Sequence, residues 1–399
     1  MFALKAVILA AGEGKRLRPF TYSEPKVMIP VANRSIMEYI VRSLVANHIE
    51  DIVVVVGYRK ERIMSYFGDG DDCGASITYV NQEKQLGNGH ALFAARNEIE
   101  NDFLVLPGDS LVDSRSISDL TSMGPEHGAL VIESNMPPKY GIAKLMKNSI
   151  SDISEKFAEG QSNMVLTGAY KLPAGVFETL GAFMDTGDYN LTHAIKTHLG
   201  KMNLQAIFCQ GLWIDAVYPW DLLEANHTAL AMSQLQTAGK IESNVTIHGK
   251  VSIGEGTVIR SGTTLYGPIV IDSGCDIGPN VSIFPSTSIG SNVTVDSFSV
   301  IRNSIIMSDC SIGPHSYLSQ SVLGYGVRAR SHLMASAADS YVQLEDAFYK
   351  VPNIGTLIGE DTLFGSGVSI EPGTIIGQKC KISSGSRINR NAPAGAIHS

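Results

Sequence analysis

The chain has 399 residues, 44% of them hydrophobic and 18% charged, and its 31 Lys and Arg against 39 Asp and Glu give a formal net charge of −8. This composition excludes a globally disordered chain, and the acidic balance argues against nucleic acid as a partner. No apolar run approaches the roughly 20 residues that a membrane-spanning helix requires, and the first run lacks the layout of a signal peptide, so we expect a cytoplasmic protein with no membrane partner.

The N-terminal half alternates apolar, strand-like runs with segments of helical periodicity. Strands are predicted at 5–9, 52–56, 77–80 and 103–106, and helices at 35–49, 59–67 and 89–99. Ser35 and Glu38 form a capping box at one helix start. This alternation is typical of an α/β domain with a largely parallel sheet, whose ligands bind beyond the carboxyl ends of the strands. We therefore expect chemistry in the loops that follow Leu9, Val80 and Leu106.

The C-terminal half carries a repeat of six residues. An aliphatic residue recurs at every sixth position from 241 to 301, the register blurs between 307 and 353, and it returns from 358 to 388. Such a period fits a short strand plus a corner, with one aliphatic side chain per hexad pointing inward. We predict a β-helix, interrupted at 307–353 by a bulging loop or packing arm. The expected domains are 1–217 and 240–399, joined by a helical connector at 218–239.

A glycine-rich turn follows the first predicted strand, at residues 9–19. It is not a Walker loop, because no Gly-Lys-Ser/Thr is present, and Leu17 replaces the third glycine of a dinucleotide fingerprint. Glycines let backbone N–H groups approach phosphates, and Arg16 and Lys26 can offset the phosphate charge. The sequence therefore predicts a phosphate-binding turn.

The pattern Gly12-x-Gly14-x-Arg16, with Pro25-Lys26 downstream, resembles the signature of sugar-1-phosphate nucleotidylyltransferases. Other segments are similar to further motifs of that family: 82–91 to its base-binding loop, 106–109 and 213–215 to its metal-binding segments, and 140–141, 155–156 and 166–170 to its sugar-contacting segments. The resemblance implies a Rossmann-like nucleotidyltransferase domain with a mixed, mostly parallel sheet.

The same resemblance implies a role for each matching residue. Asp109 and Asp215 would bind Mg²⁺, Arg16 would stabilise the reacting phosphorus and the leaving pyrophosphate, and Lys26 would act at the α-phosphate. The nucleotide is expected at Leu9, Ala10, Ala11, Gly12, Gly14, Gln82, Gln85, Gly87 and Asn88, and the sugar phosphate at Tyr140, Gly141, Glu155, Lys156, Thr167 and Gly168. His90 is expected to pack or cap, since no second histidine has ligand spacing to it.

The implied reaction joins a hexose-1-phosphate to a pyrimidine nucleoside triphosphate and releases pyrophosphate. Asn88 stands where relatives commonly have Thr, and Leu166 stands where uridylyl-type enzymes often have Asn. The segment 166–170 is closer to the thymidylyl-type pattern. Both dTTP and UTP stay open as the nucleotide, and both glucose-1-phosphate and N-acetylglucosamine-1-phosphate as the sugar.

The repeat in the C-terminal half resembles the left-handed parallel β-helix of hexapeptide-repeat proteins. The whole chain is similar to two-domain archaeal and bacterial enzymes, some of which add an acetyltransferase that uses acetyl-CoA and glucosamine-1-phosphate. His315 and Tyr317 are the candidate residues, but His315 lies one position from the family's His-x-x-Tyr spacing, so a corner histidine is favoured. A bifunctional enzyme and a non-catalytic regulatory or scaffold subunit are the alternatives to a nucleotidylyltransferase. Because hexapeptide proteins generally trimerise, we expect a homo-oligomer, a trimer or a multiple of trimers.

Overall fold

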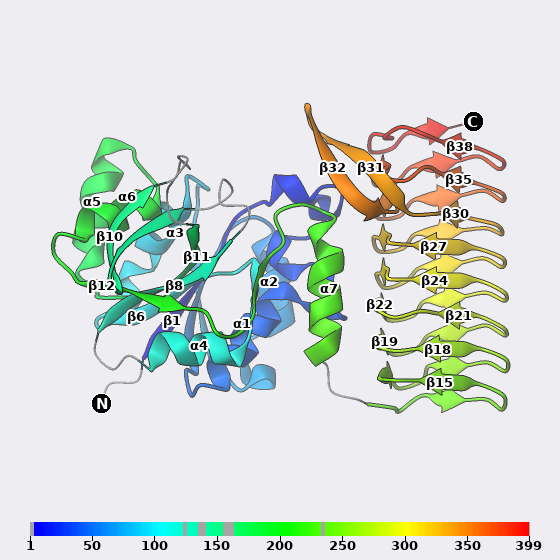
Figure 1. The fold of residues 1–399 in the computed structure, drawn as a ribbon, viewed down its shortest axis with the longest axis horizontal. Helices are drawn as coiled ribbons and strands as arrows, with labels where there is room; N and C mark the ends of the chain where they lie inside the picture. Colours follow the sequence, from blue (N-terminus) through cyan, green and yellow to red (C-terminus); the bar gives the residue numbers. More distant parts are fainter. Residues whose placement is uncertain (1–3, 123–125, 135–140, 155–162, 233–235, 399) are drawn as a thin grey trace. The chain divides into compact units, whose positions relative to one another are not determined.

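The computed structural model describes residues 4–122, 126–134, 141–154, 163–232 and 236–398. Contacts within the chain divide it into two compact units (Figure 1). The first unit comprises the chain up to Glu13, Pro25–Met28 and Ile36–Asp215. The second comprises Gly14–Glu24, Ile29–Ser35 and the chain from Ala216 onward. Two short N-terminal segments therefore pack with the C-terminal half.

The first unit is built on a nine-stranded sheet in the order β5-β4-β1-β6-β11-β8-β12-β10-β9. Its strands are β1 (Lys5–Ala10), β4 (Asp51–Val56), β5 (Ser76–Asn81), β6 (Phe103–Pro107), β8 (His127–Glu133), β9 (Ile142–Met146), β10 (Ser149–Ser154), β11 (Met164–Leu172) and β12 (Leu204–Phe208). Pairing is parallel from β5 to β6 and antiparallel beyond, apart from the parallel pair β8 and β12. The predicted strands and a mixed sheet are confirmed. The sheet is not mostly parallel, because four of its described strand pairs are parallel and five are antiparallel.

Helices cover both faces of this sheet. They are α1 (Ile36–Val45), α2 (Lys60–Phe67), α3 (Asn88–Ala94), α4 (Ser114–Thr121), α5 (Val176–Thr186) and α6 (Leu191–His198). Alternate residues of β1 serve opposite faces, since Ile8 is buried with Ile40 of α1, and Val7 is buried with Leu92 of α3. Helix α1 begins directly after Ser35, as the capping box predicts, and the helix predicted at 89–99 ends in a 3-10 turn at Ala95–Glu98.

The second unit contains a parallel β-helix of three sheets. The first sheet has β14 (Lys240–Ile241), β17 (Val258–Ile259), β20 (Asp276–Ile277), β23 (Thr294–Val295), β26 (Ser311–Ile312), β29 (Arg328–Ala329), β34 (Leu363–Phe364), β37 (Lys381–Ile382) and β39 (Ile397–His398). The second has β15 (Thr246–His248), β18 (Thr264–Tyr266), β21 (Ser282–Ile283), β24 (Val300–Arg302), β27 (Tyr317–Ser319), β30 (Met334–Ala335), β35 (Ser369–Ile370) and β38 (Arg387–Ile388). The third has β16 (Val251–Ile253), β19 (Ile269–Ile271), β22 (Thr287–Ile289), β25 (Ile305–Ile306), β28 (Val322–Leu323), β33 (Leu357–Ile358) and β36 (Ile375–Ile376).

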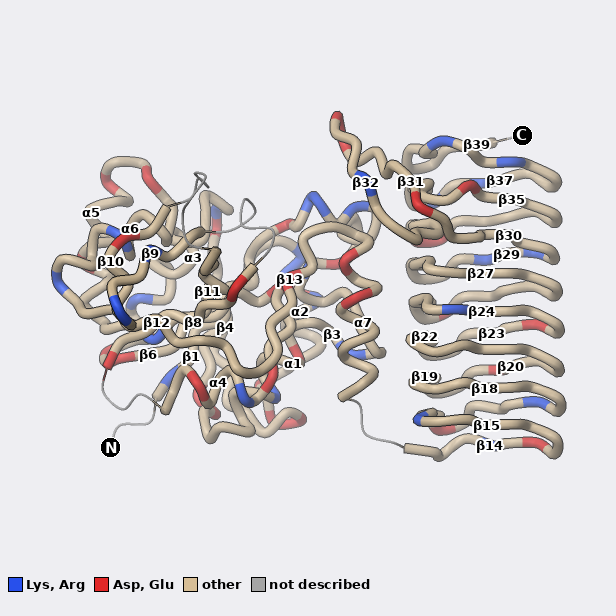
Figure 2. The backbone as a smooth tube through the Cα atoms, in the orientation of Figure 1, with Lys and Arg blue, Asp and Glu red and all other residues tan. Residues whose placement is uncertain are grey.

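The six-residue repeat forms the core of these coils. From Ile253 to Ile301 and from Ile358 to Ile388, the residues in register are at most 4% exposed. Only the first two, Ile241 and Ile247, are exposed, at 39% and 40%, because no coil precedes them. Charged residues are few along the coils (Figure 2). Aliphatic burial therefore stabilises this half, as the repeat predicts.

The blurred register has two physical causes. Strand partners in the third sheet lie 18 residues apart at Ile271 and Ile289, but 17 apart at Ile289 and Ile306 and again at Ile306 and Leu323, because one corner residue is missing in each shorter coil. The coils then continue to Ala335, where the chain leaves them as an antiparallel hairpin, β31 (Ala338–Leu344) and β32 (Ala347–Ile354). The predicted packing arm is confirmed and is shorter than 307–353.

Helix α7 (Asp221–Met232) lies within the range predicted as a connector and belongs to the second unit. Asn226 of α7 is fully buried; its Nδ2 donates to the Ser286 carbonyl at 2.9 Å, and its Oδ1 accepts from the Ser288 hydroxyl and the Ala32 amide at 2.8 Å each. Ala32 lies between the short strands β2 (Pro30–Val31) and β3 (Arg34–Ser35). One amide thus ties α7 and this N-terminal segment to the β-helix. No helix in the described ranges is long and apolar enough to cross a membrane.

Candidate active site

The glycine-rich turn begins at the carboxyl end of β1. Ala10 and Ala11 are buried, whereas Gly12 is exposed and a side chain there would meet open space. The Gly108 amide, in the loop after β6, donates to the Leu9 carbonyl at 2.9 Å, and a Cβ on Gly108 would lie 2.9 Å from that oxygen. Only glycine allows this close approach, so the loops after β1 and β6 meet at one edge of the sheet, as predicted.

The second part of the turn belongs to the second unit. Gly14 has a φ of 69° and precedes a 3-10 turn at Lys15–Leu17, which buries Leu17 completely. The Thr21 hydroxyl donates to the Gly14 carbonyl at 3.0 Å and closes the loop. Arg16 is exposed on this turn. Lys26, Asp109 and Asp215 belong to the first unit.

Strand pairing brings the two predicted metal-binding acids together. Asp109 precedes β7 (Ser110–Val112), which pairs antiparallel with β13 (Trp213–Asp215), and this register puts Asp215 opposite Ser110. Lys26 lies against both acids, with its Nζ 2.7 Å from Asp109 Oδ2 and 3.4 Å from Asp215 Oδ1. Three residues that are remote in sequence therefore form one charged cluster.

The cluster is shielded from solvent in part. The side chain of Lys26 is 13% exposed, that of Asp215 18% and that of Asp109 35%. Burial disfavours the Lys26 ammonium, but the charges and hydrogen bonds of the two carboxylates outweigh burial and raise the pKa of Lys26 above its ordinary value. Lys26 is thus a fixed cation at neutral pH.

The acidic pair fits a magnesium ion in its donor set. Mg²⁺ prefers carboxylate oxygens and is commonly held by one or two carboxylates together with substrate phosphates. Asp109 and Asp215 share one cation, the Lys26 ammonium, so their oxygens already converge. Within the described ranges no group of three or more His, Cys, Asp or Glu could hold a metal ion, so the fit rests on these two carboxylates.

The predicted base-binding loop follows β5 and leads into α3. Gln82 is 3% exposed, and its Nε2 donates to the Gly87 carbonyl at 3.0 Å and contacts His90 Nδ1 at 2.9 Å. Gln85 is exposed, and its Nε2 lies 3.3 Å from the Gln82 carbonyl. The loop therefore folds back on itself, with Gln82 inside it and Gln85 at its surface.

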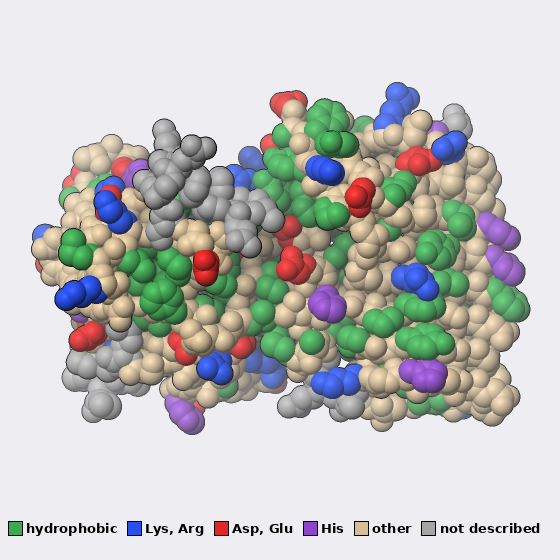
Figure 3. Space-filling model, in the orientation of Figure 1, with side chains coloured by type: hydrophobic (Ala, Val, Ile, Leu, Met, Phe, Trp, Pro, Cys, Tyr) green, Lys and Arg blue, Asp and Glu red, His purple; other side chains and the backbone are tan. Residues whose placement is uncertain are grey.

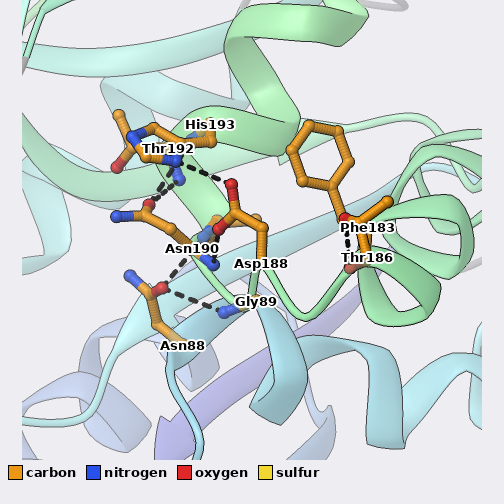
Figure 4. A network of polar contacts seen from close by, with 9 residues as sticks. Asn88, Gly89, Phe183, Thr186, Asp188, Asn190, Thr192 and His193 are labelled. Carbon is orange, nitrogen blue, oxygen red and sulfur yellow. Dashed lines mark hydrogen bonds and ion pairs between the residues drawn. The ribbon is translucent and has the colours of Figure 1, made fainter.

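Asn88 links this loop to the start of α6 (Figure 4). Its Oδ1 accepts from the Gly89 amide and from the Leu191 amide, both at 2.9 Å. Asn190 caps α6 through its Oδ1, which accepts from the Thr192 amide at 2.7 Å. The side-chain oxygen of Asn88 is therefore used within the protein, which favours a structural role at this position.

The predicted sugar-phosphate residues lie partly outside the described residues, namely Tyr140, Glu155 and Lys156. The Gly141 carbonyl accepts from the Leu166 amide at 2.8 Å. Thr167 is 3% exposed, and its hydroxyl donates to the Leu130 carbonyl at 2.9 Å, at an irregularity between β11 and β8. Gly168, with a φ of 85°, lies against Pro107 at the carboxyl end of β6. Thr167 thus shapes the strand, and Gly168 lies next to the loop that carries Asp109.

The candidate acetyltransferase residues lie on the β-helix. His315 has a φ of 59° and is exposed at a corner, where its ring stacks between those of Phe298 and His332 at 5.1 and 5.2 Å. Histidine and hydrophobic side chains gather along one edge of the β-helix (Figure 3). Tyr317 is half-buried at the start of β27. His315 is thus a corner residue, as the sequence favoured.

Sequence reasoning missed the contacts that hold the base loop. His90 contacts Gln82, and its ring meets the Tyr189 ring edge-on at 5.7 Å. The Tyr189 carbonyl accepts from the Gly89 amide at 2.9 Å. Tyr189 lies about a hundred residues from His90 in the sequence and belongs to no recognised motif. The short spacing of Gln82 and His90 was the one available signal.

The chain matches family models along most of its length. A nucleotidyl transferase model matches residues 5–231, a GMPPB C-terminal domain model matches 265–336, and a six-repeat bacterial transferase hexapeptide model matches 355–390. The chain therefore belongs to the nucleotidyl transferase family and carries a C-terminal hexapeptide region. The family recognised from its motifs is confirmed.

Individual relatives extend this assignment. The bifunctional protein GlmU of Methanococcus maripaludis is 36% identical, over 97% of this chain and 95% of the relative. The glucose-1-phosphate thymidylyltransferase of Streptomyces antibioticus is 29% identical, over 85% and 97%. A UDP-glucose pyrophosphorylase solved with UDP-glucose shares the fold, with a TM-score of 0.51 and 23% identity over 58% of this chain and 99% of that one.

Proposed function

We propose that this chain transfers the nucleotidyl group of UTP or dTTP to a hexose-1-phosphate, with Mg²⁺ held by Asp109 and Asp215. The cluster of Lys26 with these two acids carries the proposal, because it concentrates both signs of charge at the sheet edge where ligands of such folds bind. Glucose-1-phosphate and N-acetylglucosamine-1-phosphate are the proposed sugars. Relatives named as glucose-1-phosphate thymidylyltransferase and GlmU support this substrate class.

In the proposed reaction a sugar-phosphate oxygen attacks the α-phosphorus, and pyrophosphate leaves. The reaction brings two anionic phosphate groups together. Nearby cations stabilise the transition state and so lower the barrier to phosphoryl transfer. Lys26 would donate hydrogen bonds to the α-phosphate, and Arg16 would offset charge on the reacting phosphorus and pyrophosphate. The Mg²⁺ would supply Lewis acidity to phosphate oxygens. The protein supplies no nucleophile.

Pyrophosphate release from each nucleotide and sugar-phosphate pair tests this proposal. The natural chain should release pyrophosphate only with magnesium present, and Asp109→Asn should slow release by about 100-fold or more. Asp102→Asn is the matched control, because Asp102 precedes β6 at the opposite end from Asp109 and bonds His127. No release with any pair would exclude the activity.

A second activity is favoured by one observation: the chain covers 95% of a relative whose name states that it is bifunctional. We propose acetyl transfer from acetyl-CoA to the amine of glucosamine-1-phosphate on the β-helix, with His315 as the base and Tyr317 as the second candidate residue. The expected result is free CoA thiol, lost in His315→Ala and kept in His332→Ala, the neighbour in the same ring stack. No thiol from the natural chain would rule this activity out.

We also propose a cellular location and an oligomeric state for this enzyme. A cytoplasmic location and a homotrimer formed through the β-helix are the expected ones. Both follow from the family that the motifs define, and the oligomeric state is tested below.

A further inference from the structure

The side-chain amide of Gln82 has a fixed orientation in the base loop. A backbone carbonyl can only accept, so the Gln82 atom 3.0 Å from the Gly87 carbonyl must be the amide nitrogen. The same nitrogen lies 2.9 Å from His90 Nδ1, which must therefore accept, with the proton of the neutral ring on Nε2. An amide group has two N–H donors, and both are used.

The remaining polar atom of Gln82 is its carbonyl oxygen. No described residue donates a hydrogen bond to Oε1, although the residue as a whole is 3% exposed. Gln82 therefore offers one kind of contact to a ligand, a hydrogen-bond acceptor. A freely rotating amide would offer either a donor or an acceptor.

We infer that His90 is a positioning residue which, together with the Gly87 carbonyl, holds Gln82 as an acceptor and so selects uracil or thymine over cytosine. This inference rests on the proposed function, in which Gln82 contacts the base. Uracil and thymine carry a donor at N3, whereas N3 of cytosine is an acceptor. Oε1 can accept a hydrogen bond from N3–H of uracil or thymine. With cytosine, a lone pair of Oε1 would face the lone pair of N3, which is unfavourable.

His90 is itself held by its surroundings. Its ring meets the ring of Tyr189 at 87°, and the Tyr189 carbonyl accepts from the Gly89 amide. A Cβ on Gly89 would lie 2.7 Å from that carbonyl oxygen, so α3 and the turn before α6 are in close backbone contact. Asn88 adds its bonds to Gly89 and Leu191 across the same junction (Figure 4). The acceptor is thus held on a rigid support.

The test compares UTP and CTP, both in equilibrium binding and in kcat/KM for pyrophosphate release, using the full chain. The natural chain should favour UTP by at least about tenfold, because a mismatched polar contact is costly. His90→Leu keeps apolar bulk and removes the acceptor, and it should lower the UTP-to-CTP ratio by about fivefold, as expected for loss of one neutral hydrogen bond. His90→Asn places an oxygen as many bonds from Cα as Nδ1, and should restore the ratio to within about twofold.

His193→Leu is the matched control, because His193 bonds Asp188 at the start of α6. It should leave the ratio unchanged. A natural chain that binds and turns over UTP but does not disfavour CTP overturns the inference without any variant. An unchanged ratio in an active His90→Leu also overturns it. Absence of pyrophosphate from every pair is a different outcome, which removes the proposed function and this inference with it.

Discussion

Lys26 is the residue whose environment most directly connects structure with chemistry. Its ammonium lies between two carboxylates that come from the loop after β6 and from β13. Two neighbouring carboxylates without a cation would repel each other and be costly to bury. Lys26 offsets one of their two negative charges and keeps a cation at the site. The same side chain therefore contributes to stability and, in the proposed reaction, to phosphate binding.

Lys26→Met should slow pyrophosphate release by about 100-fold or more, because a buried charge-assisted donor is lost. It should also lower the free energy of unfolding at pH 7 by about 3 kcal/mol, because the two carboxylates are left without their cation. Folding raises the pKa of Lys26 from 10.5, so its contribution is complete below pH 10.5 and is lost as the pH rises through the folded-state pKa.

Denaturant unfolding of both proteins between pH 7 and pH 11 measures this difference. The two free energies should differ by a constant amount up to about pH 10 and converge above it. Lys201→Met, at an exposed lysine after α6, is the control and should change neither activity nor stability. A difference that vanishes at neutral pH would contradict the assigned charge state.

Residue motifs predicted the acids and Lys26 but not what surrounds the base loop. Gly12, Arg16, Asp109 and Asp215 stand in short patterns whose chemistry can be recognised in sequence. The partners of Asn88 depend on how α6 packs against α3, about a hundred residues along the chain. No local pattern reports such a contact, and the assignment of Asn88 to the nucleotide stays a prediction.

The hairpin β31–β32 is the element that departs most from the repeat. Tyr349 of β32 lies 4.8 Å from the Tyr218 ring and 5.5 Å from the Trp220 ring, and Tyr218 stacks on Trp220 at 4.8 Å. Burial and a hydrogen bond with Tyr349 raise the pKa of Tyr218 to about 12. The arm thus holds the chain just before α7 against the β-helix.

Tyr349→Ala should lower the free energy of unfolding by about 2 kcal/mol, because two aromatic contacts and a hydrogen bond are lost. Limited proteolysis should then cut the segment before α7 faster than in the natural chain. Phe348→Ala removes the adjacent ring, which is 67% exposed, and should change neither measurement. Equal effects of the two substitutions would show that the cluster does not hold the arm.

The period of six predicted the coils because each hexad obeys one local rule: an aliphatic residue inward and a small residue at the corner. It lost the register where Ile301 is followed by Ile306 and Leu318 by Leu323, since a coil can close with 17 residues when one corner shortens. The fold tolerates that deletion because the parallel pairing is kept. A prediction that relies on a strict period of six residues does not allow for such a deletion.

At the scale of the whole molecule, the predicted site residues come from both compact units. The turn with Arg16 belongs to the second unit, and Lys26 with both acids belongs to the first. The two units therefore cannot be separated by cutting the sequence at a single point. Exchange of the C-terminal half between relatives would also change the surroundings of Arg16.

The β-helix is expected to mediate assembly. Light scattering of the full chain should give three times the 42.8 kDa of one chain, or a multiple of that mass. The mass should not depend on nucleotide or magnesium, because the contact surface is expected on the coils. A mass of one chain at micromolar concentration would contradict this expectation.

In the proposed reaction, Asp109 and Asp215 act on one divalent cation. A double-substitution cycle tests it most directly, with kcat/KM for pyrophosphate release measured for Asp109→Asn, Asp215→Asn and both together. Residues that act as a unit have non-additive effects, so the double variant should be no more than about tenfold slower than either single variant. A double variant whose loss in kcat/KM equals the product of the two single losses would contradict a shared ion. A single variant with full activity would contradict it as well.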